Sequence, residues 1–354
     1  MLTVGETSVE ATKQRYLYLD LVKIAACFMV IVNHSNSSVF LGISPSPTWF
    51  VSVAVFFLSK PAVPLFLMAS GAVLLGREEH ISAALKRAAR ILAVLYISSA
   101  FYFYLTAPLP KLSLVNLKSF LITTLHTPAT NALWYLYLYL GLLLMLPLLN
   151  RLVKVLTPRD YVYIAVLGIG IRGSVPIVKH YFPNLFLSSY FLTPLFTAYL
   201  AFFLCGYWLH KRGTPSGRTT AKTAALCAAL VLLCVAATYA ECRKVGQEYL
   251  FLDNTAYLPI ALCAIGFFVI IQYLAPRLRV PDRAARVIAA VGQCTFGIYI
   301  MSDYALMHFM PVRVALTSVF HPLVAVFIYQ LFVFALGLVF TYLLRLIPFM
   351  RKLL

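Results

Sequence analysis

Three ionisable residues lie in or at the edges of the first long apolar stretch of the chain: Asp20, Lys23 and His34. Charged groups are costly inside a bilayer, so each of them is a candidate functional residue that needs a partner. In an α-helix, Lys23 and His34 would project from one face and lie about 16 Å apart along the helix axis. Asp20 would point about 40° away from the stripe that these two residues form on the helix surface. An imidazole, whose ordinary pKa is about 6.5, is suited to take the proton of a hydroxyl that attacks a thioester carbonyl.

A less specific interpretation of the same residues is also possible. Asp20 and Lys23 could form an i,i+3 ion pair at the membrane interface, while His34 caps the outer end of the span. Both interpretations stay open for Asp20, whereas we favour a chemical role for His34.

The elements that must position these residues are membrane-spanning helices. The chain is 62% hydrophobic and 11% charged, against about 45–50% and about 25% in soluble domains, which excludes a soluble globular protein. Apolar stretches long enough to cross a bilayer as helices recur throughout. They predict an all-α polytopic membrane protein with a single domain over residues 1–354 and about ten transmembrane helices. The predicted spans are 16–33, 49–75, 90–106, 132–149, 161–178, 189–209, 223–240, 255–275, 287–310 and 322–344.

The basic residues are distributed unevenly between the two sides of these spans. With the N-terminus inside, 20 of the 29 Lys and Arg residues fall on the cytoplasmic side, 7 on the other side and 2 within spans. This asymmetry follows the positive-inside rule and predicts that both termini are cytoplasmic. It also accounts for the formal charge of +18 without a nucleic-acid partner. The seven cysteines form no CxxC pair, so we expect no metal and no disulfide.

Several segments together resemble acyltransferase family 3, the integral-membrane O-acyltransferases. Lys23 and His34 fit the family's pattern of a basic residue, ten residues and a histidine. The other matching segments, in the family's order, are VPLFLMASGAVLLG (63–76), LKRAARIL (85–92), ALWYLYLYLGLLLMLPLL (132–149) and VGQCTFGIYIM (291–301). The resemblance covers nearly the whole chain.

Three departures from the family pattern bear on which acceptor the protein uses. Tyr139 and Leu140 stand where the polysaccharide-modifying branch has acidic residues, so the chain looks closer to the shorter, enterobacterial-common-antigen-type branch. An Arg-x-Arg motif is reduced, because position 89 is Ala. Ser302, followed by Asp303, replaces a frequent histidine.

The resemblance implies an O-acetyltransferase of the bacterial cytoplasmic (inner) membrane, with acetyl-CoA as donor and a polysaccharide or glycolipid hydroxyl as acceptor. Lys86, Arg87 and Arg90 at the start of the third span could bind the donor's phosphates, and its pantetheine arm would pass Lys23 on the way to His34. The alternative is that these cations only follow the positive-inside rule and bind no ligand. His34 would act as base or, as a less favoured route, be acetylated itself.

Two further groups complete the predicted site. Asp303 could orient or stabilise His34, because a buried carboxylate needs a basic partner, or it could simply meet water at the outer interface. Trp134, Tyr135 and Tyr137 could form a platform for a sugar or serve as interface anchors. The main rival function is a proton- or ion-coupled transporter that uses Asp20, Lys23, His34 and Asp303 as relay groups. The oligomeric state cannot be read from the sequence.

Overall fold

The computed structural model describes residues 16–41, 45–106, 114–185 and 188–353, and these residues fold almost entirely into helices. The two ends of the predicted domain, 1–15 and 354, lie outside the described residues. In chain order the elements are α1 (Leu17–Phe40), α2 (Pro47–Ser59), α3 (Ala62–Leu74), α4 (Ile81–Thr106), α5 (Leu114–His126), η1 (Asn131–Leu133), α6 (Trp134–Val155), α7 (Pro158–Ala165), η2 (Val166–Ile171), α8 (Arg172–Tyr181), α9 (Ser189–Leu192), α10 (Ala198–Arg212), α11 (Gly217–Val245), α12 (Leu258–Leu274), η3 (Ala275–Arg277), α13 (Asp282–His308), α14 (Met310–Thr317), α15 (Pro322–Leu346) and α16 (Pro348–Leu353).

The structure confirms an all-α membrane protein. Within the described residues, eight helical segments are long and apolar enough to cross a membrane, and each overlaps a predicted span. Large apolar side chains such as Leu232 and Leu343 are exposed on the outer faces of α11 and α15, as expected for helices that face lipid. The other two predicted crossings correspond to α4 and α10, so the count of ten stays a prediction.

Two predicted spans are interrupted by prolines. Pro61 and Pro64 divide the second span into α2 and α3, because proline lacks an amide hydrogen and clashes with the preceding turn. The predicted span 189–209 is likewise split into α9 and α10 around Pro194. The new helix starts where the Thr197 side chain accepts a hydrogen bond from the Leu200 amide.

The short helix α10 packs closely against α3. A Cβ atom on Gly71 would lie 1.8 Å from the Phe203 carbonyl oxygen, and one on Gly206 would lie 2.1 Å from that of Met68. The two backbones therefore touch where each helix has a glycine, as is common in packed membrane helices. This contact fixes α3, which carries one wall of the site described below.

The close contact predicts the effect of adding one methyl group. Gly206→Ala should lower the unfolding temperature of the purified protein in detergent, because overpacking of this kind typically costs about 1–3 kcal/mol. Gly141→Ala on α6 is the matched control, since nothing lies within 4 Å of its added Cβ. We expect the control to unfold at the same or a higher temperature, because alanine favours a helix over glycine by about 1 kcal/mol. Equal unfolding temperatures for the two variants would contradict the tight contact.

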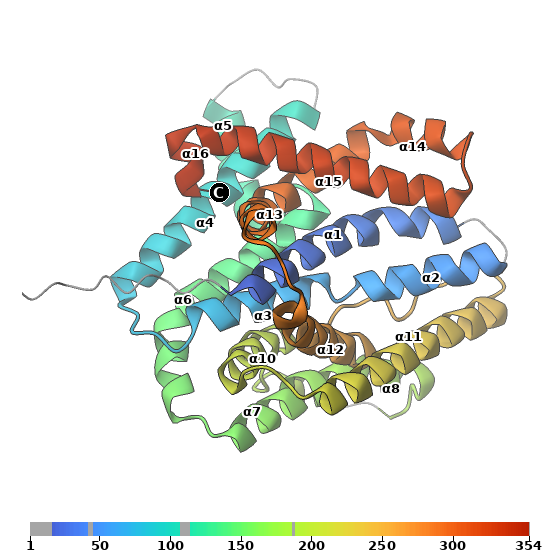
Figure 1. Cartoon of the computed structure of the whole chain (residues 1–354), viewed down its shortest axis with the longest axis horizontal. Helices are drawn as coiled ribbons and strands as arrows, with labels where there is room; N and C mark the ends of the chain where they lie inside the picture. Colours follow the sequence, from blue (N-terminus) through green and yellow to red (C-terminus); the bar gives the residue numbers. More distant parts are fainter. Residues whose placement is uncertain (1–15, 42–44, 107–113, 186–187, 354) are drawn as a thin grey trace, which may run out of the picture.

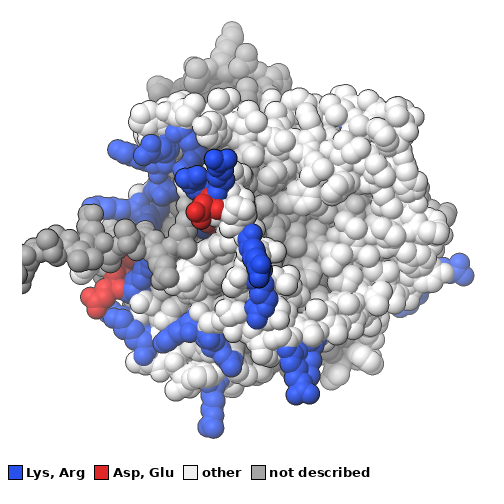
Figure 2. Space-filling view, viewed as in Figure 1, with Lys and Arg blue, Asp and Glu red and all other residues white. Residues whose placement is uncertain are grey.

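On the face shown in Figure 2, basic side chains gather toward one end of the bundle, and we call it the basic end. Figure 2 shows Lys and Arg concentrated on the left and lower parts of the visible face, which correspond in Figure 1 to the start of α4 and the ends of α6 and α15. The start of α1 lies there too, because Tyr18 is hydrogen-bonded to His210 at the end of α10. Arg345 near the end of α15 donates to Gln293 of α13. The opposite end of the bundle is called the far end.

Candidate active site

The helix α1 runs through the bundle without a break and carries all three ionisable residues singled out in the sequence. It packs against α13, α2, α3 and α15. Asp20 and Lys23 lie toward the basic end, and His34 lies toward the far end. By helix rise the Lys23 and His34 backbones are about 16 Å apart. The site therefore has two regions, a basic cavity beside Lys23 and a polar cluster around His34.

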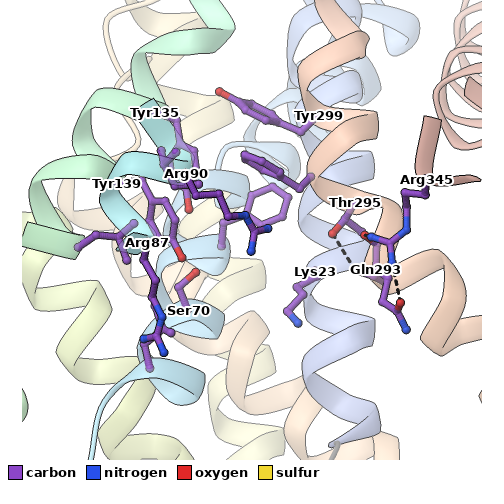
Figure 3. A pocket seen from close by; sticks show the side chains of 16 residues that line it. Lys23, Ser70, Arg87, Arg90, Tyr135, Tyr139, Gln293, Thr295, Tyr299 and Arg345 are labelled. Carbon is purple, nitrogen blue, oxygen red and sulfur yellow. Dashed lines mark hydrogen bonds between the residues drawn. The ribbon is translucent and has the colours of Figure 1, made fainter. Parts of the chain in front are cut away.

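The first region is a cavity of about 400 Å³ between α1, α3, α4, α6, α13 and α15. Four cationic side chains line it: Lys23, Arg87, Arg90 and Arg345. Figure 3 shows Arg87 and Arg90 reaching in from one side, with Lys23 and Arg345 on the other. None of the sixteen described residues that line the cavity is acidic. The cavity is therefore suited to an anionic ligand that takes several charge-assisted hydrogen bonds.

Neighbouring groups hold these cations in place. Arg87 pairs with the buried carboxylate of Glu79 at 3.0 Å. The Arg90 Nε atom donates to the Leu353 carbonyl oxygen at 3.1 Å, which brings α16 to the cavity. Arg345 donates to the carbonyl and side-chain oxygens of Gln293 at 3.1 and 2.8 Å. The four cations thus come from three helices that are far apart in the sequence.

Asp20 lies behind the cavity wall. It is 3% exposed and its carboxylate lies 3.7 Å from the Lys23 ammonium. A Cβ atom on Gly292 would come within 2.8 Å of the Asp20 Oδ1 atom, so the carboxylate occupies space that this glycine leaves open. The structure brings Asp20 together with Lys23 and not with His34. Asp20 can therefore position Lys23, and by helix rise it lies about 21 Å from the level of His34.

Aromatic side chains form the inner wall of the cavity. Tyr135 and Tyr139 are stacked with ring centroids 5.7 Å apart, and Tyr299 packs edge-on against Tyr135 at 5.8 Å. The Tyr299 hydroxyl donates to the Ala132 carbonyl oxygen. Tyr139, one of the residues that departs from the polysaccharide-modifying branch, therefore faces the cavity. An extended ligand would pass from the cations along these rings.

The second region places His34 beside Asp303. The His34 Nδ1 atom lies 4.0 Å from the Asp303 Oδ1 atom, and both side chains are partly buried. Asp303 follows Tyr299 by one helical turn, so α13 links the cavity wall to the His34 region. Buried Tyr102 stabilises this turn, because its hydroxyl donates to the Ile300 carbonyl oxygen at 2.7 Å and accepts from the Tyr304 amide at 3.0 Å. A carboxylate in this place can orient an imidazole that acts as a base.

Lys60 and Asp253 also belong to the His34 region, although the sequence analysis did not assign them a role. The Lys60 ammonium forms an ion pair with the Asp253 carboxylate, and Lys60 is joined to the His34 region because the Asn33 amide, next to His34, donates to the hydroxyl of Ser59, next to Lys60, at 3.3 Å. Lys60 had one signal in the sequence, namely a lysine inside an apolar span. Asp253 had none, because it lies in a polar connection between spans.

Four other predicted residues have separate environments. Lys86 is exposed on α4 and does not line the cavity. Of the three aromatics predicted to bind a sugar, Tyr135 lines the cavity, while Trp134 packs against Tyr199 with centroids 5.6 Å apart. The Tyr137 hydroxyl donates to the Thr124 carbonyl oxygen. The structure therefore does not bring the three rings together into one platform.

A family model described as an acyltransferase domain matches residues 16–346, nearly the whole chain. The chain belongs to this acyltransferase family. Together with its apolar helices, membership makes the protein a multi-pass membrane acyltransferase, in agreement with the resemblance found in the sequence. A search of curated proteins finds no match, and a search of solved structures finds none either.

The residues of this membrane acyltransferase offer acid–base and electrostatic chemistry. Among the described residues, no group of three His, Cys, Asp or Glu side chains is arranged to hold a metal ion. An imidazole with an adjacent carboxylate can accept and return a proton, and an ammonium can stabilise developing negative charge. The basic cavity can hold an anionic ligand through its four cations.

Proposed function

We propose that the protein transfers an acetyl group from cytoplasmic acetyl-CoA to a hydroxyl of a cell-surface polysaccharide or glycolipid precursor in the bacterial inner membrane. The observation that carries the proposal is the basic cavity, whose four cations lie at the end of the helix that also holds His34. Coenzyme A carries a pyrophosphate and a ribose phosphate, and guanidinium groups bind such phosphates through paired hydrogen bonds.

The geometry supports a path for the acyl group. With its phosphates at Arg87, Arg90 and Arg345, the donor would extend its thin pantetheine arm past Lys23 and along the aromatic wall. Tyr299 lines the cavity, and Asp303 follows it by one helical turn on α13. The distance of about 16 Å between the levels of Lys23 and His34 is of the order that the arm spans. The thioester would then lie near the imidazole.

At the far end, His34 takes the proton of the acceptor hydroxyl as its oxygen attacks the thioester carbonyl. Asp303 orients the imidazole and stabilises the imidazolium that forms. The same proton then passes to the sulfur of the leaving coenzyme A. A base of this kind typically contributes about 100- to 10,000-fold to the rate.

The proposed donor site is tested by removing its cations. Arg87→Gln combined with Arg345→Gln should raise the Michaelis constant for acetyl-CoA at least about tenfold, because each lost charge-assisted hydrogen bond is worth about 1.5–3 kcal/mol. The assay measures transfer of radiolabelled acetyl from acetyl-CoA to a membrane extract by the purified protein, and the labelled product is then identified. Added salt should weaken donor binding by the wild type.

Lys86→Gln is the matched control for the donor site. Lys86 neighbours Arg87 on α4 but lies outside the cavity, so the same loss of charge should leave the Michaelis constant within about twofold, as is usual for an exposed charge. An unchanged constant in the Arg87→Gln/Arg345→Gln variant would mean that these arginines serve only to orient the protein in the membrane.

A further inference from the structure

Lys60 is a buried cation at the break between α2 and α3, and Figure 1 shows that these two helices follow one another through the interior of the bundle. Lys60 is 7% exposed, and its ammonium lies 4.3 Å from the centroid of the Phe56 ring. A lysine at this depth is costly unless its charge is paired or used. The pair that it forms with Asp253 explains how the charge is tolerated, but not why an apolar residue does not take its place.

The partner carboxylate comes from the segment 246–257, which joins α11 to α12 at the far end. Phe251 holds this segment in place two residues before Asp253, because its ring stacks on the His180 imidazole with centroids 3.7 Å apart. His180 in turn lies 3.2 Å from the buried Glu241 carboxylate. The Asp253 side chain remains 56% exposed. Asp253 is therefore largely exposed at the far end, while its carboxylate contacts the buried Lys60 ammonium.

The break that carries Lys60 is joined directly to the part of α1 that carries His34. The Asn33 amide, next to His34, donates to the hydroxyl of Ser59, next to Lys60, at 3.3 Å. The Asn36 side-chain amide, also on α1, donates to the Ser52 carbonyl oxygen of α2 at 2.5 Å. Both side-chain amides that flank His34 are therefore engaged with α2. The Lys60 ammonium has three N–H donors, of which the contact with Asp253 needs one.

We propose that Lys60 is a further catalytic residue, whose ammonium donates a hydrogen bond to the acyl carbonyl oxygen as that oxygen becomes an oxyanion. Asp253 is the positioning residue that holds the ammonium beside His34. This inference rests on the proposed acetyl transfer. It assigns to Lys60 the stabilisation of charge that the proton transfer at His34 does not provide.

In the proposed step, every bond that forms is matched by one that breaks. The acceptor oxygen bonds to the acyl carbon while its proton moves to His34, and the carbonyl electron pair moves to the oxygen that Lys60 contacts. The carbonyl then re-forms, the carbon–sulfur bond breaks, and the thiolate takes the proton from His34. The products are the acetylated acceptor and free coenzyme A thiol. Lys60 keeps its own protons throughout.

The test compares Lys60→Met, Asp253→Asn and the double variant with the wild type in the labelled-acetyl assay. If Lys60 stabilises the oxyanion, Lys60→Met and the double variant should each lose about 100- to 1,000-fold in kcat, the loss typical for one oxyanion donor. Affinity for acetyl-CoA, measured by calorimetry, should stay within about twofold, because the donor phosphates bind at the other end of the site. Asp253→Asn should lose much less, because the ammonium remains. Lys244→Met, an exposed charge near the end of α11, is the control and should retain full activity.

A purely structural ion pair gives a different pattern. Both single variants would then lose activity equally, and the double variant, which leaves no unpaired charge, would recover to within about tenfold of the wild type. Equal losses in the two single variants would overturn the proposal, and so would recovery of activity in the double variant. If the double variant unfolds at a lower temperature, the comparison of the two single variants still decides. A wild type that transfers no acetyl group would instead refute the proposed function, and it would do so before any Lys60 variant is measured.

Discussion

Replacing His34 with alanine should lower the rate of acetyl transfer by about 100- to 10,000-fold, the usual contribution of a general base. His34 is the imidazole whose Nδ1 atom lies 4.0 Å from the Asp303 Oδ1 atom. The loss should appear in kcat, because the proposed site for the donor's phosphates lies at the other end of α1. Turnover by the purified variant and calorimetry of acetyl-CoA binding check the two parts of this expectation.

The matched control for this variant is His126→Ala, which removes an exposed imidazole at the end of α5. It should keep full activity. If His34→Ala retained more than about a tenth of wild-type turnover, the base role would be lost. Intact-mass measurement of wild type with acetyl-CoA but no acceptor adds a second readout. An acetyl group found on His34 would replace direct transfer with the covalent route.

The donor is expected to enter the protein from one side of the membrane only. Sealed inside-out vesicles given external acetyl-CoA should release coenzyme A thiol and acetylate an enclosed acceptor, whereas right-side-out vesicles should release none. The physical reason is that coenzyme A is too polar to cross the bilayer, and that from the positive-inside rule we expect the basic end with its cavity to be cytoplasmic. Thiol release measured in both preparations checks this expectation.

Detergent provides the control for vesicle orientation. Permeabilised right-side-out vesicles should release thiol at the rate of the inside-out preparation, which shows that enzyme is present in both. Equal release from both sealed preparations would contradict a donor path from one side. Accumulation of an unmodified solute without any thiol release would instead favour a transporter.

Much of the fold was predictable because a bilayer imposes a local rule. Backbone groups inside lipid must be bonded within their own segment, so each long apolar stretch has to be a helix. The eight segments able to cross the membrane accordingly overlap the predicted spans. The Lys23 and His34 stripe on α1 was predictable for a similar reason, because the regular helix fixes which residues share a face. The break between α2 and α3 also has a local cause, because Pro61 and Pro64 lie there.

The remaining features depend on contacts between segments that lie far apart in the chain. Arg345 reaches the cavity only because α15 packs beside α13, and 258 positions separate it from Arg87. Asp253 joins Lys60 because the 246–257 segment folds inward at the far end. No periodicity in the sequence reports such pairings. The sequence by itself therefore determined the helices, the family and the His34 helix, while the packing of the helices decided which charges share a cavity and which surround the imidazole.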